Sequence, residues 1–371
     1  MTNSATKLTD EQLKYWLAWA RIKKIGPVRW QKLINYFPNM EMAWRAGRQE
    51  LLPVGLGEQV IAEIIATRSM INPDEELSNL KKENINIVTI IVEEYPWRLK
   101  QIYDAPPILF YRGSLDCLSR TCIAVVGTRK YSPYGEQVTE EITAGLCRHG
   151  LTIVSGLALG IDALAHQVTL KNNGLTAGIL GSSVDWQNVY PSSNRYLAQK
   201  IIDSGGIVAS EYPINTSPAK YTFPERNRIV SGLSWGVLVI EAPESSGALI
   251  TAKIALEQNR EVLAVPGNIF NHNSVGTNNL IKQGAKVITK AEDVLEELDI
   301  NTLEQLPLLQ PEIKISPDEQ EILKLLSKEP THIDNLAKTS KIRINVLLST
   351  LTMLEMKGVI KDMGGKNYII K

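Results

Sequence analysis

Short apolar runs alternate with helical segments over the middle of the chain. The runs are CIAVVG, LTIVSG, TAGILG, GIVASE, VLVIEA, EVLAVPG and KVIT. Between them lie segments with helical spacing, among them SPYGEQVTEEITAGLCRH, DALAHQVTLKNN, NRYLAQKIIDS and ALITAKIALEQN; Ser132 and Pro133 mark the start of the first. Continuous β-branched strands separated by helices are typical of a parallel sheet covered on both faces. The pattern predicts a doubly wound, mostly parallel, Rossmann-like α/β domain over residues 116–297.

The chain before this domain falls into two parts. Residues 1–72 carry helical spacing, with glycine turns in KKIGPVRWQKLINYF and VGLGEQVIAEIIATR. Two short helices around such a turn resemble helix-hairpin-helix or SAM-like units, in which turn amides and helix N-termini meet a phosphate backbone. A small packing module explains the same pattern, because helical hairpins are common. Residues 73–115, with EEYPWRLKQIYDAPPILFYRG, predict an extended arm packed on the core.

The chain after this domain predicts a linker and a further small domain. Residues 298–316 are polar and contain prolines, as linkers do. Residues 317–371 read as helix, helix, longer helix and two strands around glycines, which is the order of a winged helix. The presumed recognition helix, RINVLLSTLTMLEMKG, offers few polar side chains for the major groove: Arg343, Asn345, Ser349 and Thr352. Contact with DNA and contact with protein are both open at this point.

Composition changes this picture little. Of 371 residues 44% are hydrophobic, and the formal net charge is zero, so a polyanion would have to bind at a local basic patch. The cysteines Cys117, Cys122 and Cys147 form no CxxC pair, which favours a reducing compartment. The polar start is unlike a signal peptide, and the longest apolar run, Ile85–Val92, is too short to cross a membrane. We expect a cytoplasmic protein without a membrane partner.

No cofactor or metal is predicted. The first strand is not followed by GxGxxG, which disfavours a plain NAD site, and GxxxxGK[ST] is absent. The scattered His149, His272 and His332 form no metal-ligand cluster. Other titratable groups have structural interpretations. His166 is assigned a packing role and Asp162 a favourable interaction with the helix dipole. Glu211 and Glu241 follow strands, but they form no convincing catalytic pair.

Glycine and hydroxyl residues follow several of the predicted strands. In GTRKYSPYG, Gly127 allows a tight turn, Thr128 offers a hydroxyl and Arg129 offers a planar cation that suits phosphate. In SGLALGIDALAH and EAPESSGALITAK, small residues let backbone amides approach an anion at a helix N-terminus: Ser155, Gly156, Gly160, Ser246 and Gly247. Ligands of such sheets bind at the carboxyl ends of the strands, so these turns are candidates for one site.

The segment SPAKYTFPERNR, ahead of the fifth of these strands, adds cations and aromatic rings. Its polar residues are Lys220, Arg226, Asn227 and Arg228, and its rings Tyr221 and Phe223 are possible stacking platforms. A mononucleotide would need fewer cations than are gathered here. Several phosphates in a row, with unstacked bases, would use all of them, which is what a single strand presents.

The motifs VGTRKYSPYG, SGLALGIDALAH, FPERNRIVSGLS, SSGALITAKIALEQNREVLAVPGN and GTNNLIKQGA closely resemble the DNA-processing protein A family, also called DprA or Smf. The resemblance covers about 300 residues. It implies a homodimer that binds single-stranded DNA without sequence preference and has no catalytic activity. It also implies protection of incoming strands, loading of the RecA recombinase in natural transformation (competence), and help in displacing single-strand-binding protein.

The resemblance also implies roles for particular residues. Arg129 and Lys220 would contact phosphates and Phe223 would stack on a base, while Arg226, Asn227 and Arg228 would hold the pocket wall. Two departures from the family's motifs occur: Thr128 in the GxR turn, and GSSVDWQNVYP, with Ser183 and a longer insert, where the family has GxGxDxxYP.

Two other classes of protein remain as alternatives. The related nucleoside-monophosphate phosphoribohydrolases also present glycine turns to a phosphate, but their PGGxGTxxE turn carries a catalytic glutamate. Here PESSGALITAK lacks that glutamate, and Glu257 lies further along the helix. A transcription regulator acting through the winged helix is the other alternative, although the tail is only slightly basic.

Overall fold

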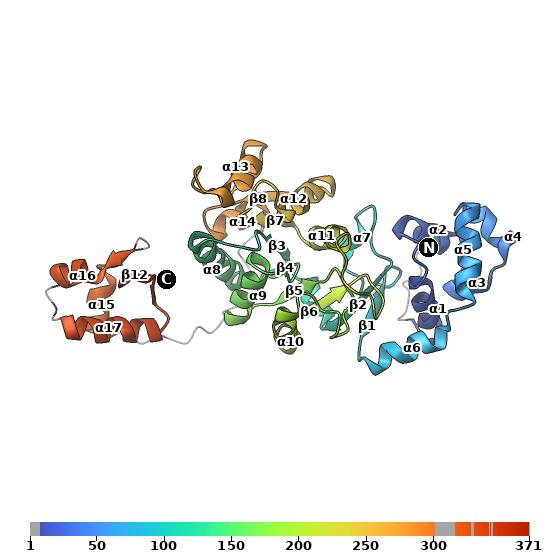
Figure 1. Ribbon diagram of the computed structural model, residues 1–371, viewed down its shortest axis with the longest axis horizontal. Coiled ribbons are helices and arrows are strands. Elements are labelled where there is room, and N and C mark those ends of the chain that lie inside the picture. Colours follow the sequence, from blue (N-terminus) through green and yellow to red (C-terminus); the bar gives the residue numbers. More distant parts are fainter. Residues whose placement is uncertain (1–7, 301–315, 328–329, 341, 343, 371) are drawn as a thin grey trace. The chain divides into compact units, whose positions relative to one another are not determined.

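A computed structural model describes residues 8–300, 316–327, 330–340, 342 and 344–370 (Figure 1). The chain divides into two compact units, one ending at residue 306 and the other beginning at residue 307. This division falls inside the predicted linker 298–316, most of which lies outside the described residues. The described residues of the first unit form two buried apolar clusters, and those of the second unit form one.

The first unit opens with short helices: α1 (Asp10–Ala20), α2 (Pro27–Tyr36), α3 (Met40–Arg45), α4 (Arg48–Leu51), η1 (Leu52–Val54) and α5 (Glu58–Arg68). They pack around tryptophans. Trp16 stacks on Trp30 with ring centroids 5.3 Å apart, and Trp19 meets Trp44 edge to face at 5.5 Å. Glycines cap α2 and α5 at the turns noted in the sequence. DNA contact by these turns stays a prediction.

Residues 73–115 are more regular than the extended arm that their prolines predict. They form α6 (Pro73–Lys82), β1 (Asn86–Thr89), α7 (Trp97–Lys100) and β2 (Ile108–Gly113). Strand β2 pairs antiparallel with both β1 and β6, so the segment adds two strands to the main sheet. The run ILFYRG is mostly buried, and a strand pairs its backbone groups where a buried loop would leave them unsatisfied.

Nine strands form the main sheet, in the order β1-β2-β6-β5-β4-β3-β7-β8-β9. Each of the seven predicted runs contains one strand: β3 (Cys122–Val126), β4 (Thr152–Ser155), β5 (Thr176–Ile179), β6 (Ile207–Ser210), β7 (Gly236–Val239), β8 (Glu261–Ala264) and β9 (Lys286–Val287). These seven pair in parallel throughout. The predicted mostly parallel, Rossmann-like sheet is therefore confirmed.

Helices cover both faces of this sheet, as the continuous apolar strands require. Along β3, Ile123 and Val125 share a buried cluster with α8 and α14, whereas Ala124 and Val126 share one with α11 and α12. Ser132 accepts a hydrogen bond from the Gly135 amide at 3.2 Å and caps α8 as predicted. The helices are α8 (Pro133–Arg148), α9 (Ile161–Lys171), α10 (Arg195–Asp203), α11 (Thr222–Leu233), α12 (Gly247–Glu257), α13 (Val275–Lys282) and α14 (Ala291–Glu297), with the short η2 (Leu115–Ser119), η3 (Ser192–Asn194) and η4 (His272–Ser274).

In the part of the second unit that the structure describes, three strands and three helices form a small domain. Its sheet has the antiparallel order β10-β12-β11, and its core gathers apolar residues from every helix. The elements are α15 (Pro317–Leu323), β10 (Thr331–His332), α16 (Ile333–Ser340), α17 (Ile344–Met356), β11 (Ile360–Asp362) and β12 (Asn367–Ile370). No helix in the described ranges of either unit has the length and apolarity to cross a membrane.

Candidate nucleic-acid interface

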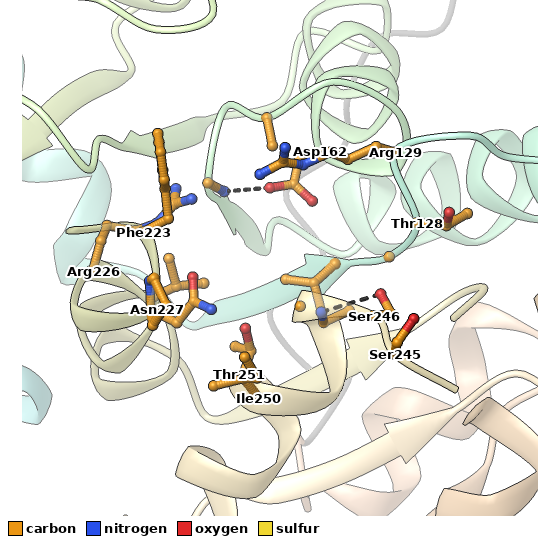
Figure 2. A pocket seen from close by; sticks show the side chains of 18 of the residues that line it. Thr128, Arg129, Asp162, Phe223, Arg226, Asn227, Ser245, Ser246, Ile250 and Thr251 are labelled. Carbon is orange, nitrogen blue, oxygen red and sulfur yellow. Dashed lines mark hydrogen bonds between the residues drawn. The ribbon is translucent and has the colours of Figure 1, made fainter. Parts of the chain in front are cut away.

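A cleft of about 640 Å³ lies at the carboxyl ends of β3 and β7 (Figure 2). Its walls are the turn after β3, the turn between β4 and α9, the helix α11, and the turn from β7 into α12. After β3 the chain forms β4, β5 and β6 on one side of it, and then crosses to form β7 on the other side. Open α/β sheets bind ligands in the crevice at such a switch point.

Ten of the thirteen predicted site residues line this cleft: Gly127, Thr128, Arg129, Gly156, Lys220, Phe223, Arg226, Asn227, Ser246 and Gly247. Ser155, Gly160 and Arg228 do not. The Ser155 hydroxyl is buried and donates to the Val125 carbonyl at 2.7 Å. Gly160 has φ 84°, and a Cβ there would lie 2.2 Å from the Thr128 carbonyl oxygen, so it lets two turns pack closely. Contact of any of these residues with DNA stays a prediction.

Arg228 is separated from the cleft because its segment is a helix, α11, which the sequence pattern does not indicate. Residues three and four apart on a helix share a face, whereas residues two apart do not. Phe223, Arg226 and Asn227 therefore face the cleft together, as Figure 2 shows. Arg228 lies behind them and pairs with Glu211. The structure thus corrects its expected position in the pocket wall.

Arg226 is a buried cation in the cleft, with only 5% of its surface exposed. Its Nη1 donates to the Ile179 carbonyl, and its guanidinium lies where a Gly156 side chain would be, 2.1 Å from an added Cβ. Burial lowers the pKa of Arg226 to about 10; Asp162 opposes this shift and Arg129 adds to it. The side chain therefore remains charged at neutral pH. Its Nε is buried and has no acceptor among the described residues.

Asp162 is the one carboxylate in the described lining of the cleft. Its Oδ2 accepts a hydrogen bond from the Gly156 amide at 3.0 Å, so it holds the turn on which Arg226 rests. Burial raises the pKa of Asp162, and Arg226 opposes that rise. The sequence assigns this residue only a helix-dipole role. With Arg129 and Lys220 also lining the cleft, three cations face one carboxylate, and the positive charge is in excess.

An aromatic pair stands at the rim. The rings of Tyr190 and Phe223 lie 5.6 Å apart between centroids, and Tyr190 is half exposed. The sequence analysis does not identify Tyr190, although this residue belongs to the GSSVDWQNVYP motif. Tyr221 is exposed and lies outside the lining.

Ser183, in the GSSVDWQNVYP motif, forms two hydrogen bonds with Thr216. Its amide donates to the Thr216 carbonyl and its hydroxyl accepts from the Thr216 amide, both at 3.0 Å. The serine therefore ties this loop to the segment that leads into α11.

Both carboxylates considered as hydrolytic acids are engaged away from the cleft. Glu241 accepts hydrogen bonds from the Ser132 amide and hydroxyl, at 2.9 and 2.6 Å, and so supports the start of α8. Glu211 pairs with Arg228. Neither lines the cleft, so neither is placed to act on a ligand bound there.

His166 is fully buried, and its Nδ1 lies 2.6 Å from the Thr176 hydroxyl oxygen, in keeping with the packing role assigned to it. Burial lowers the pKa of His166 to about 3. The unfolded chain would bind a proton near pH 6.5, whereas the folded chain would not until about pH 3.

We expect His166 to reduce stability as the pH falls from about 6.5 toward 3, by up to about 1.4 kcal/mol per pH unit. Denaturant unfolding of the protein and of His166→Asn, which keeps a donor near the Nδ1 position but does not titrate, would measure this. The free energy of unfolding of the variant should depend less steeply on pH, and the difference in slope should reach at most the value for one bound proton. Identical slopes would contradict the prediction.

The helix α17 exposes apolar side chains as well as polar ones, among them Asn345, Ser349 and Thr352. The hydroxyls of Ser349 and Thr352 donate to carbonyls of their own helix, and Arg343 lies outside the described residues. Its exposed apolar residues are Ile344, Val346, Leu348 and Met353. Contact of this helix with DNA and with protein both stay predictions.

The parallel sheet, the switch-point cleft with its excess of cations and the small second domain define a Rossmann-like α/β protein with a cationic cleft. The family described as DNA recombination-mediator protein A matches residues 86–299, and the DprA winged helix domain matches residues 307–366. The chain belongs to the DNA recombination-mediator protein A (DprA/Smf) family, as its motifs predict. The winged helix predicted for the second unit is confirmed with it.

Relatives align over most of the chain. Protein Smf of Synechocystis is 35% identical, over 97% of this chain and 99% of its own length. DNA processing protein DprA of Bacillus subtilis is 46% identical over 60% of this chain and 74% of its own. The crystal structure of DprA from Streptococcus pneumoniae superposes with TM-score 0.66 and 36% identity over 79% of this chain and 99% of that one. A structure of DprA from Helicobacter pylori is described as showing a single-stranded DNA binding mode of that protein. It superposes with TM-score 0.52 and 30% identity, over 58% of this chain and 97% of that one.

Proposed function

We propose that this protein binds single-stranded DNA in the switch-point cleft, without sequence preference and without making or breaking a bond. The observation that carries the proposal is the convergence of Arg129, Lys220 and Arg226 with the Tyr190–Phe223 pair in one cleft. Cations along a groove suit the phosphates, and aromatic faces suit unstacked bases of any identity. The Helicobacter relative's recorded binding of single-stranded DNA supports the same class of ligand.

The test replaces Arg129 or Lys220 by glutamine and measures affinity for oligonucleotides of different composition at several salt concentrations. Each variant should bind all sequences more weakly, and the slope of log affinity against log salt should shrink by about 0.7 for each phosphate that the variant no longer neutralises. Lys171→Gln, an equal charge change at the far end of α9, is the control. Affinities equal to those of the control for both cleft variants would reject the site.

Family membership supports the rest of the proposal. The protein would act in the cytoplasm as a homodimer that protects strands taken up in transformation and loads RecA onto them, displacing single-strand-binding protein. A phosphoribohydrolase activity has little support, because Asp162 is the one carboxylate in the described lining and it is bonded to the Gly156 amide. Release of a free base from a nucleoside monophosphate would overturn the non-enzymatic assignment.

A further inference from the structure

A second depression lies at the opposite, amino ends of the same two strands. Residues 118–121 lead into β3, Trp235 immediately precedes β7, and the start of α7 closes the third side. Because a strand rises about 3.3 Å per residue, the five residues of β3 separate this depression from the cleft by about 17 Å. The two share no lining residue.

Two indole rings and a guanidinium form its wall. The Cζ atom of Arg98 lies 4.0 Å from the ring centroid of Trp235 and 5.1 Å from that of Trp97, both within the range of cation–π attraction. The two rings are 6.3 Å apart and nearly perpendicular. Trp97 is 53% exposed, so it presents a flat apolar surface to solvent at the mouth of the depression.

Positive charge gathers here without carboxylate partners. Arg98 and Arg120 line the depression, and the buried Arg260 donates to the Arg98 carbonyl at 2.9 Å. None of the three forms an ion pair with any residue that the structure describes. Burial lowers the pKa of Arg98 to about 10, and the neighbouring Arg260 adds to the shift. An anion in the depression would relieve this repulsion.

The size of the depression limits what can enter it. Its volume of about 70 Å³ is roughly a ninth of that of the cleft, so a single phosphate group suits it better than a whole nucleotide. A base attached to that phosphate would have to remain outside, where Trp97 offers a stacking surface. We propose that this depression is a second contact for single-stranded polynucleotide, with a phosphate between Arg98 and Arg120 and a base on Trp97. This second contact depends on the proposed function only for the class of its ligand, a single-stranded polynucleotide.

The experiment compares the full chain with Trp97→Ala and Arg120→Gln, using oligothymidylates of about 4 and about 40 nucleotides, at the lower limit of what one groove accommodates and well beyond it. Trp97→Ala should weaken binding of the long strand about 5- to 150-fold, the equivalent of one stacked base. For the same long strand, Arg120→Gln should make the slope of log affinity against log salt less steep by about 0.7. The short strand, held in the cleft, should bind as before. Arg148→Gln, an exposed arginine where α8 ends, is the matched control.

Three outcomes would overturn the inference. If the protein binds both strands but both variants behave like Arg148→Gln, the second contact is wrong and the proposed function stands. If the variants weaken binding of the short strand as much as binding of the long strand, the substitutions do not act through a separate second contact. If the protein itself binds neither strand, the proposed function fails and this contact fails with it. Arg120 is exposed, so its variant tests the site without disturbing the core.

Discussion

Replacing Arg228 by methionine is expected to lower the free energy of unfolding by about 3–5 kcal/mol, the range for removing one partner of a buried ion pair. Arg228 is 9% exposed, and its guanidinium pairs with Glu211 and, at 3.3 Å, with Asp104. Burial raises the pKa of Glu211 and Arg228 opposes that rise, so the variant would leave a buried carboxylate without its counter-charge. Denaturant unfolding measures the loss.

Two further variants separate this explanation from a general loss of packing. Glu211→Met combined with Arg228→Met should recover part of the stability, because the uncompensated carboxylate is then removed as well. Arg148→Met, on the exposed end of α8, should change stability by no more than about 0.5 kcal/mol. If the folded Arg228→Met protein lost affinity for single strands as Arg129→Gln does, Arg228 would have to be returned to the binding site.

Replacing Gly156 by alanine should weaken single-strand binding by about 10- to 150-fold, the range for one hydrogen bond to a charged group. An added Cβ would lie 2.1 Å from the Nη1 of Arg226, so the guanidinium would have to leave its place. Arg226 would then lose its bond to the Ile179 carbonyl and its position beside Asp162. Oligonucleotide titration at fixed salt measures the change.

Gly178 in β5 offers a matched control outside the cleft. An added Cβ there would make ordinary contacts, 3.5 Å or more from its neighbours, so Gly178→Ala should bind nearly as the unchanged protein does. Equal affinities for Gly156→Ala and the unchanged protein would show that the position of Arg226 does not matter for binding.

The strands and the first helix start were predictable because their signals are local. A short, continuous β-branched run favours a buried strand, and Ser132 followed by Pro133 marks a helix start without help from distant residues. The run ILFYRG was missed because the prolines before it dominate the local pattern, although its burial makes it the strand β2. Pairing of β2 with β6 joins segments almost a hundred residues apart, and no local signal carries it.

The parallel sheet, the glycine and hydroxyl turns at the strand ends and the family of the chain could be predicted because each is encoded by residues that are neighbours in the sequence. Which cations share a site depends on how distant segments pack, and the sequence pattern does not show it. The segment of Arg226 and Arg228 is helical because Ile229, Val230 and Leu233 pack against the sheet. That helix points one arginine into the cleft and the other toward Glu211, and adjacency in the chain does not distinguish them.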